Sequence, residues 1–195
     1  MEETYTPLAF PGRDRLLRRI DEAVALGDPP LVTRAVKDAL SEAIADPAIQ
    51  LPACVRRPVP GHYARREIHR SAALGYSIIT MCWASGQGTP LHDHDALWCV
   101  EGVWQGDLQV TPYTLLEQQG ERHRFRAEPV LYGHCGSTGS LIPPFEYHTL
   151  CNASEEDVAV SVHVYQAPME RSAVFEPMDE QGWYVRRVKC LGIDA

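Results

Sequence analysis

Two segments near the N-terminus carry apolar residues at helical spacing. In the first, apolar side chains recur every three or four positions opposite a charged side, and the apolar set is Leu16, Leu17, Ile20, Ala23 and Val24. This pattern ends near Gly27. The second stripe follows Asp28-Pro29-Pro30, a helix start signal, and runs from Leu31 to Ile44 before Pro47. Two amphipathic helices are predicted, and each should pack on something larger.

Beyond Pro60 the pattern changes to short runs rich in Val, Ile, Tyr and Trp, separated by Gly, Pro and Asp clusters. Such short strands suit a closed or double-layered antiparallel sheet. We therefore expect a mainly β fold, with a helical segment over residues 1–59 packed on a barrel of residues 60–195 as one structural domain. The predicted strands are Tyr76–Trp83, Ala96–Val103, Asp107–Tyr113, Pro129–Cys135, Ser140–Ile142, Ala159–Tyr165 and Trp183–Val188.

Composition limits the function. The 195 residues, of which 45% are hydrophobic, can bury a core without a disulfide or structural metal, so a metal would serve chemistry. The net charge of −8 disfavours nucleic acid and anionic membranes as partners. A cytoplasmic protein is expected, because no signal peptide or long apolar segment is seen and the six cysteines include no Cys-x-x-Cys pair.

Two of the eight histidines, His92 and His94, flank Asp93. On an extended strand alternate side chains share a face, so the two imidazoles would project together and could bind one metal ion. Asp93 would then face away and brace a neighbouring turn. Taken alone, the pair is better explained by two surface or hydrogen-bonded core histidines.

The surrounding residues favour the metal. The segment Gly86-x5-His92-x-His94-x4-Cys99-x6-Gly106 resembles the first signature of the cupin superfamily, with Cys99 where a cupin usually places a glutamate ligand. With His148, which the next segment supplies, the site would have three neutral imidazoles. These would leave coordination positions open for substrate, which indicates catalysis. Imidazole itself suits Fe, Zn, Cu and Ni alike.

A second segment, Pro143 to Asn152, resembles the second cupin signature, with Phe145 in place of the usual glycine. It brings His148 from another strand. The resemblance implies a cupin-type double-stranded β-helix (jelly-roll) barrel and a metal held by His92, His94 and His148.

Three histidines without the carboxylate, and with a cysteine in its place, resemble the cysteine dioxygenase family over roughly residues 60–175. The chain is identified as a bacterial member of these cupin-fold thiol dioxygenases. Ser161-Val162-His163-Val164-Tyr165 is similar to the family's Ser-x-His-x-Tyr triad. The resemblance implies an Fe(2+) cofactor and a thioether bond between Cys99 and Tyr165, as in several members. It implies catalytic roles for Tyr165, His163, Ser161 and Cys99, with His163 fixing the Tyr165 hydroxyl and Ser161 behind it.

Tyr63-Ala64-Arg65 resembles the substrate-binding segment of the same family. The resemblance places the Arg65 guanidinium on the substrate carboxylate, beside Tyr63, and an arginine there favours cysteine over mercaptopropionate. The planar fork suits a carboxylate, which it grips with two parallel hydrogen bonds. Arg66 would point the opposite way, to the surface, although a register slip of one residue would exchange the two arginines.

The resemblance implies a dioxygenase that adds both atoms of O2 to the sulfur of a small thiol, with L-cysteine going to cysteine sulfinic acid. Gln166-Ala167-Pro168 and Trp98 are closer to the mercaptopropionate branch. The alternatives are therefore oxidation of 3-mercaptopropionate or mercaptosuccinate, or a non-catalytic metal-binding cupin. The expected partners are the thiol and O2, with no nucleic acid and no membrane, and the chain is expected to be a monomer or small homo-oligomer.

Overall fold

The computed structural model describes residues 8–144, 146–179 and 181–195. The two predicted helices are α1 (Arg13–Val24) and α2 (Pro29–Ala45), and a short 3-10 helix covers Ala53–Arg56. None of the described helices is both long and apolar enough to cross a membrane. The strands are β1 (Ala64–Arg70), β2 (Ser77–Trp83), β3 (Leu91–His92), β4 (Cys99–Gln105), β5 (Leu108–Gln119), β6 (Arg122–Ala127), β7 (Leu131–Gly133), β8 (Thr138–Leu141), β9 (His148–Asn152), β10 (Ala159–Tyr165), β11 (Arg171–Pro177) and β12 (Trp183–Cys190).

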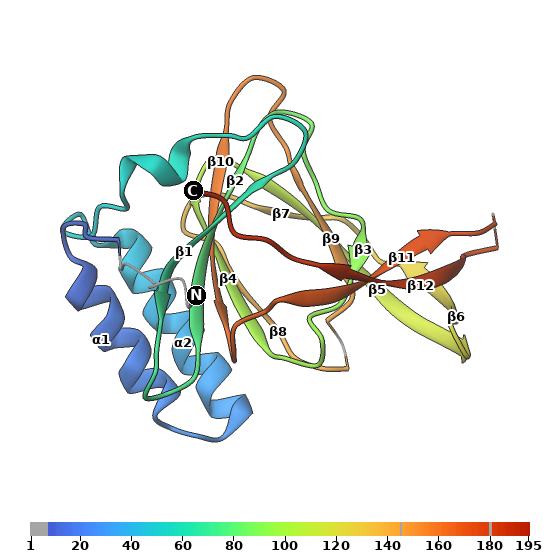
Figure 1. Ribbon diagram of the computed structural model, residues 1–195, viewed down its shortest axis with the longest axis horizontal. Helices are drawn as coiled ribbons and strands as arrows, with labels where there is room; N and C mark the ends of the chain where they lie inside the picture. Colours follow the sequence, from blue (N-terminus) through green and yellow to red (C-terminus); the bar gives the residue numbers. More distant parts are fainter. Residues whose placement is uncertain (1–7, 145, 180) are drawn as a thin grey trace, which may run out of the picture.

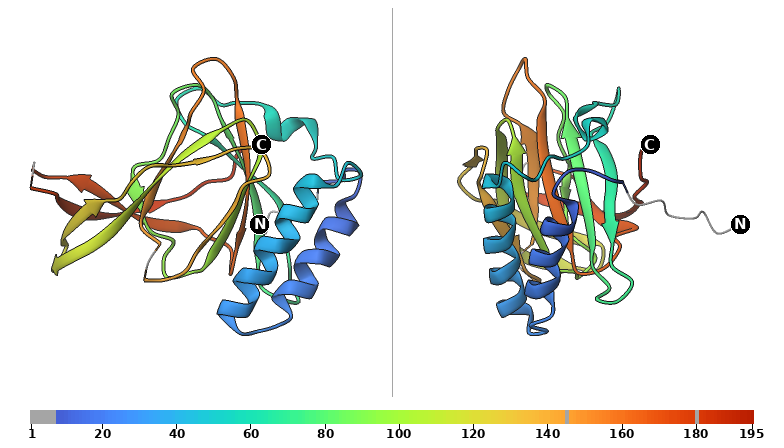
Figure 2. Two further views of the ribbon diagram at one scale, coloured as in Figure 1. Left: turned by 180° about the vertical axis from the view of Figure 1, so that it is seen from behind. Right: turned by 90° about the vertical axis from the view of Figure 1, so that its left-hand side faces the viewer.

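The strands form two antiparallel sheets. One has the order β1-β2-β10-β4-β8 and the other the order β6-β12-β11-β3-β9-β5-β7. Figures 1 and 2 show both helices against the five-stranded sheet, while the hairpin of β11 and β12 projects with β6 away from the barrel on the opposite side. This arrangement confirms the mainly β, cupin-type barrel with N-terminal helices.

Helix packing explains the apolar face of β10. Val160, Val162 and Val164 point out of the barrel and are buried in one cluster with Leu40 of α2. Helix and sheet approach closely at Gly102 of β4, where a Cβ atom would lie 2.8 Å from Ile44 Cδ1 and 3.0 Å from Leu40 Cδ2. Because glycine has no Cβ, α2 can lie directly on the strand. The other face of β10 is left for the barrel interior.

The structure contains strands that were not among the seven predicted ones, namely β1, β3, β6, β9 and β11. β6 and β11, of sequence RHRFRA and RSAVFEP, form much of the projecting arm and lack a continuous apolar face. The strand that carries His92 ends at that residue, so His94 follows β3 rather than continuing it. The predicted sharing of one strand face by His92 and His94 was therefore wrong in its geometry.

Candidate metal and substrate site

Three histidines meet between the two sheets. His92 ends β3, and its register partner across the sheet is His148, the first residue of β9. His94 lies two residues farther along the chain, where its side chain is only 1% exposed. Each ring offers a nitrogen, and the three nitrogens lie within 4.8 Å of one another. A single ion can therefore contact all three.

The hydrogen bonds of these rings leave nitrogen lone pairs free. Because a carbonyl oxygen only accepts, Nδ1 of His148 donates to the Glu146 carbonyl at 2.8 Å, and Nδ1 of His92 to the Pro90 carbonyl at 3.1 Å. Nε2 of His148 and Nδ1 of His94 are buried without any partner among the described residues. Unpartnered buried nitrogens are costly, and metal coordination would satisfy them.

Burial also keeps the rings neutral. It lowers the pKa of His94 and of His148 well below the ordinary histidine value, and neighbouring imidazoles lower both further. A neutral imidazole is the form that binds a metal. Asp93 braces the loop as expected, because its Oδ1 accepts the Ala173 amide at 2.8 Å.

The histidines open onto a small cavity of about 20 Å³ that Tyr63, Arg65 and Tyr165 also line. Arg65 donates through Nη1 to the Gly192 carbonyl at 3.0 Å and through Nη2 to the Met169 carbonyl at 3.4 Å. Its Nε is buried without a partner among the described residues. Guanidinium N–H groups therefore remain for an anionic ligand.

Arg66 points away from the cavity, as predicted. The prediction that it lies at the surface was wrong. Arg66 is only 6% exposed and donates to the carbonyls of Arg57 and Ala195, both at 2.9 Å. Backbone oxygens satisfy this buried charge, and Arg66 is not among the residues that line the cavity. The register therefore places Arg65, and not Arg66, in the cavity.

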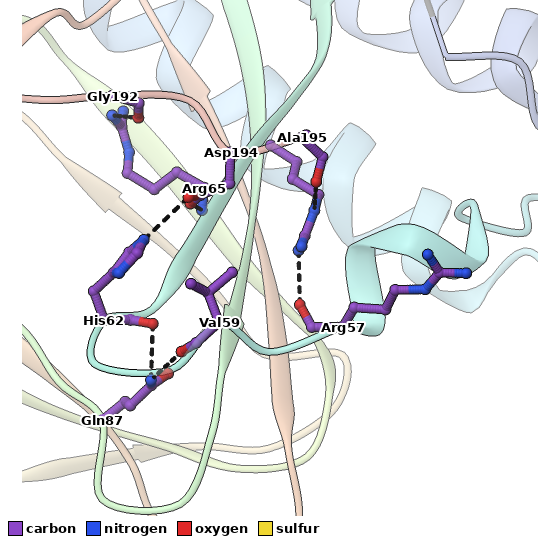
Figure 3. A network of polar contacts seen from close by, with 9 residues as sticks. Arg57, Val59, His62, Arg65, Gln87, Gly192, Asp194 and Ala195 are labelled. Carbon is purple, nitrogen blue, oxygen red and sulfur yellow. Dashed lines mark hydrogen bonds and ion pairs between the residues drawn. The ribbon is translucent and has the colours of Figure 1, made fainter.

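The chain after β12 holds Arg65 in position. The Asp194 amide donates to the Arg65 carbonyl at 2.7 Å, and the Arg65 amide donates to Asp194 Oδ2 at 2.8 Å. His62 pairs with the same carboxylate at 3.0 Å. Figure 3 shows Asp194 beside β1 and the Arg65 guanidinium directed to Gly192. The segment after β12 therefore contributes to the site, although it lies far along the sequence from the three histidines.

On β10, Ser161 and His163 face the interior and form a relay. Trp83 Nε1 donates to Ser161 Oγ at 2.9 Å, and Ser161 Oγ lies 2.7 Å from His163 Nε2. The other ring nitrogen, Nδ1, lies 3.5 Å from Glu101 Oε2. Both nitrogens of His163 therefore face groups other than the Tyr165 hydroxyl, which corrects the expected bond between His163 and that hydroxyl. The rings of His163 and Tyr165 are instead nearly parallel, with centroids 6.0 Å apart.

Cys99 and Tyr165 are direct register partners across β4 and β10. Burial raises the pKa of both side chains well above their ordinary values, and a side-chain hydrogen bond from Tyr165 opposes that shift at the thiol. The two groups are thus in contact on the cavity side of the sheet. Tyr63 stacks on Trp83, with ring centroids 4.5 Å apart, and forms another wall.

Sequence reasoning missed Glu101 and Lys189. Burial raises the pKa of Glu101 to about 7. Its signal was its position two residues after Cys99, which places both on one face of β4. Lys189 of β12 lines the histidine cavity with Arg65, and no local pattern marked it in a basic, exposed strand.

A cluster of three histidines between the sheets of a jelly-roll barrel defines a metal site of the cupin class. The family profile described as cysteine dioxygenase type I matches residues 61–177, and the chain belongs to this family.

The curated relatives are modestly similar. Cysteine dioxygenase type 1 of Homo sapiens is 26% identical over 102 residues, which cover 52% of this chain and 50% of the human protein. The enzyme of Danio rerio is 25% identical over 103 residues, with the same shares. The match therefore spans about half the length of these relatives.

Two solved structures are also similar. One is the TT1209 protein from Thermus thermophilus, at 17% identity and a TM-score of 0.46, covering 60% of this chain and 94% of that one. The other is oxalate oxidase with the substrate analogue glycolate, at 22% identity and a TM-score of 0.42, covering 56% and 53%.

Proposed function

We propose that the protein is a non-haem Fe(2+)-dependent thiol dioxygenase that adds both atoms of O2 to the sulfur of a small thiol. The proposed substrate is L-cysteine and the product cysteine sulfinic acid, a sulfinate. The observation that carries the proposal is that one cavity is lined by three converging histidines, two of them with an unpartnered buried ring nitrogen, by a guanidinium with an unpartnered N–H, and by a tyrosine. Membership of the cysteine dioxygenase family supports the same reaction.

His92, His94 and His148 would hold the metal, because their free nitrogens converge and their burial keeps them neutral. Ferrous iron held by these residues would supply open coordination sites for a thiolate and for dioxygen and would favour the thiolate form of the substrate. The donor set of imidazoles fits iron, and the family favours it over zinc or copper.

Arg65 would bind the substrate carboxylate and so fix the end of the molecule opposite the sulfur. The Nε–H group of Arg65 is buried without a partner among the described residues, and it would donate to this carboxylate. Tyr63 stacks on Trp83 and would close the cavity beside the guanidinium.

Tyr165 would hold its hydroxyl against the reacting sulfur, with Cys99 fixing the ring. We propose that a thioether joins Cys99 Sγ to the Tyr165 ring in part of the population, since the two residues are register partners in contact. Ser161 and His163 are placed to hold the barrel wall behind Tyr165 through the bond of 2.7 Å between them.

We also propose that residues 1–59 and 60–195 form one structural domain, and that the protein works in the cytoplasm as a monomer or small homo-oligomer. The shared cluster of helix and sheet residues supports the single domain.

A thiol panel tests the function. The protein is loaded anaerobically with Fe(2+), mixed with L-cysteine, 3-mercaptopropionate, mercaptosuccinate or cysteamine, and then exposed to oxygen while oxygen uptake and sulfinate are recorded. The proposal predicts uptake matched by sulfinate for L-cysteine. Full iron loading with no uptake for any thiol would contradict it and would favour a non-catalytic metal-binding cupin. His148→Ala, which removes one imidazole, is the matched negative control.

A further inference from the structure

Another pocket adjoins the histidine cavity and shares part of its lining. It measures about 230 Å³ and is formed largely by the chain around the end of β12. Four residues line both spaces: Tyr63, Arg65, Lys189 and Leu191. The small inner cavity therefore continues into a larger outer one, and two cationic side chains lie where they meet.

Lys189 differs from the other basic residues of β12 because it has no acidic partner among the described residues. On the same strand, Arg186 lies 3.9 Å from Glu121 and Arg187 lies 3.6 Å from Glu176. No carboxylate of the described residues lies within ion-pair distance of Lys189. The ammonium group thus faces the shared opening with its charge uncompensated by any described acidic side chain.

The strand register explains why Lys189 faces the opening. Its partner across the sheet is Ser172 of β11, which is 3% exposed and lines the inner cavity. Residues directly opposite in antiparallel strands project to the same side.

The other charged groups of the outer pocket leave a net positive opening. Asp194 is the acidic side chain that lines it, and this carboxylate already accepts the Arg65 amide and pairs with His62. Arg65 and Lys189 remain for a ligand. On a chain with a net charge of −8, such a local pair of cations attracts small anions into a site that the rest of the surface would repel.

We propose that Lys189 forms, with the outer pocket, a subsite for a second carboxylate of the thiol substrate. A thiol with two carboxylates would place its sulfur at the histidines, one carboxylate on Arg65 and the other on Lys189. The site would thus bind thiol dicarboxylates in addition to L-cysteine, and more tightly than the corresponding monocarboxylate. This inference rests on the proposed function in one respect: it assumes that the ligand is a thiol whose sulfur lies at the histidines.

Mercaptosuccinate and 3-mercaptopropionate are a suitable pair of probes, because they differ by one carboxylate. Their dissociation constants are measured anaerobically by calorimetry on the Fe(2+)-loaded protein, and their KM values by oxygen uptake. Tighter binding of mercaptosuccinate to the wild type is expected. Lys189→Gln should weaken mercaptosuccinate binding about tenfold, the loss of one charge-assisted contact, and leave 3-mercaptopropionate within about twofold. Lys189→Arg should restore most of the affinity.

Arg187→Gln is the matched control, since it removes the same charge from the same strand two residues away, outside both pockets. Its affinity for both thiols should equal that of the wild type. The proposal is overturned if Lys189→Gln weakens both thiols equally, if Arg187→Gln has the same effect as Lys189→Gln, or if the wild type binds the two thiols equally. If binding depends on Lys189 but no thiol consumes oxygen, the subsite stands and the dioxygenase function fails.

Discussion

Arg65 is the residue whose chemistry decides which end of a substrate is recognised. Arg65→Gln keeps hydrogen-bonding capacity but removes the charge and the planar fork. We expect KM for L-cysteine to rise about 10- to 100-fold, the loss of a charge-assisted pair, while cysteamine, which has no carboxylate, is used as before. Oxygen-uptake kinetics with both thiols provide the measurement.

Arg66→Gln is the control for this prediction, because Arg66 is equally buried but directed away from the cavity. It should lower stability and leave KM unchanged. An equal loss for L-cysteine and cysteamine in Arg65→Gln would remove Arg65 from carboxylate binding.

Cys99 and Tyr165 make a second prediction at the residue scale. Formation of a carbon–sulfur bond between Sγ and the ring removes two hydrogens, which dioxygen accepts as the oxidant. Part of the purified protein should therefore weigh two hydrogens less and migrate anomalously on a denaturing gel. Cys99→Ala should abolish this fraction, whereas Cys82→Ala, which changes a buried cysteine of β2 that is not paired with Tyr165, should retain it. Its absence from fully active enzyme would show that the pair is only adjacent.

At the scale of elements, α2 lies on β4 because Gly102 has no side chain. Gly102→Val would force Leu40 and Ile44 aside, and we expect the free energy of unfolding to fall by about 1–3 kcal/mol, as for other overpacked cores. Gly139→Val on neighbouring β8 is the control, since the nearest atom to a Cβ there is 3.9 Å away. It should stay within about 0.5 kcal/mol of the wild type in urea unfolding. Equal destabilisation by both substitutions would contradict this packing.

The elements also show what the sequence could predict. The two helices could be predicted from their apolar periodicity. The strand of Ser161, His163 and Tyr165 could be predicted as well, because the valines that alternate with these residues form an apolar face that packs under α2. The projecting strands β6 and β11 could not be predicted this way, because neither has a continuous apolar face: arginines alternate along β6, and β11 carries Arg171 at one end and Glu176 near the other. Lys189 and Glu101 escaped for a related reason: their roles depend on cross-sheet neighbours that no local spacing reports.

At the scale of the whole molecule, the buried histidines make the metal-free protein sensitive to acid. Burial lowers the pKa of His92, His94 and His148, and it lowers that of His163 to about 3. Below about pH 6.5 the unfolded chain takes up protons at these residues and the folded chain does not, so stability falls as pH falls. The carboxyl of Glu101, with its pKa raised to about 7, binds its proton in the folded state first and opposes this loss.

Four histidines outweigh one glutamate, and we expect the free energy of unfolding of the metal-free protein to drop by roughly 3 kcal/mol between about pH 7.5 and about pH 5.5. Glu101→Gln should make the drop larger, and His94→Gln with His148→Gln should make it smaller. Urea unfolding at both pH values measures the change. A stability independent of pH in this window would contradict the burial of neutral imidazoles.

The claim on which the account depends is that the three-histidine site directs both atoms of dioxygen to a thiol sulfur. Reaction of the Fe(2+)-loaded protein with L-cysteine under ¹⁸O₂, followed by mass spectrometry of the product, tests this directly. The account predicts a sulfinate in which both oxygen atoms carry the label, and no such product with His148→Ala. A disulfide, an unlabelled or singly labelled sulfinate, or no product from fully loaded protein would contradict it.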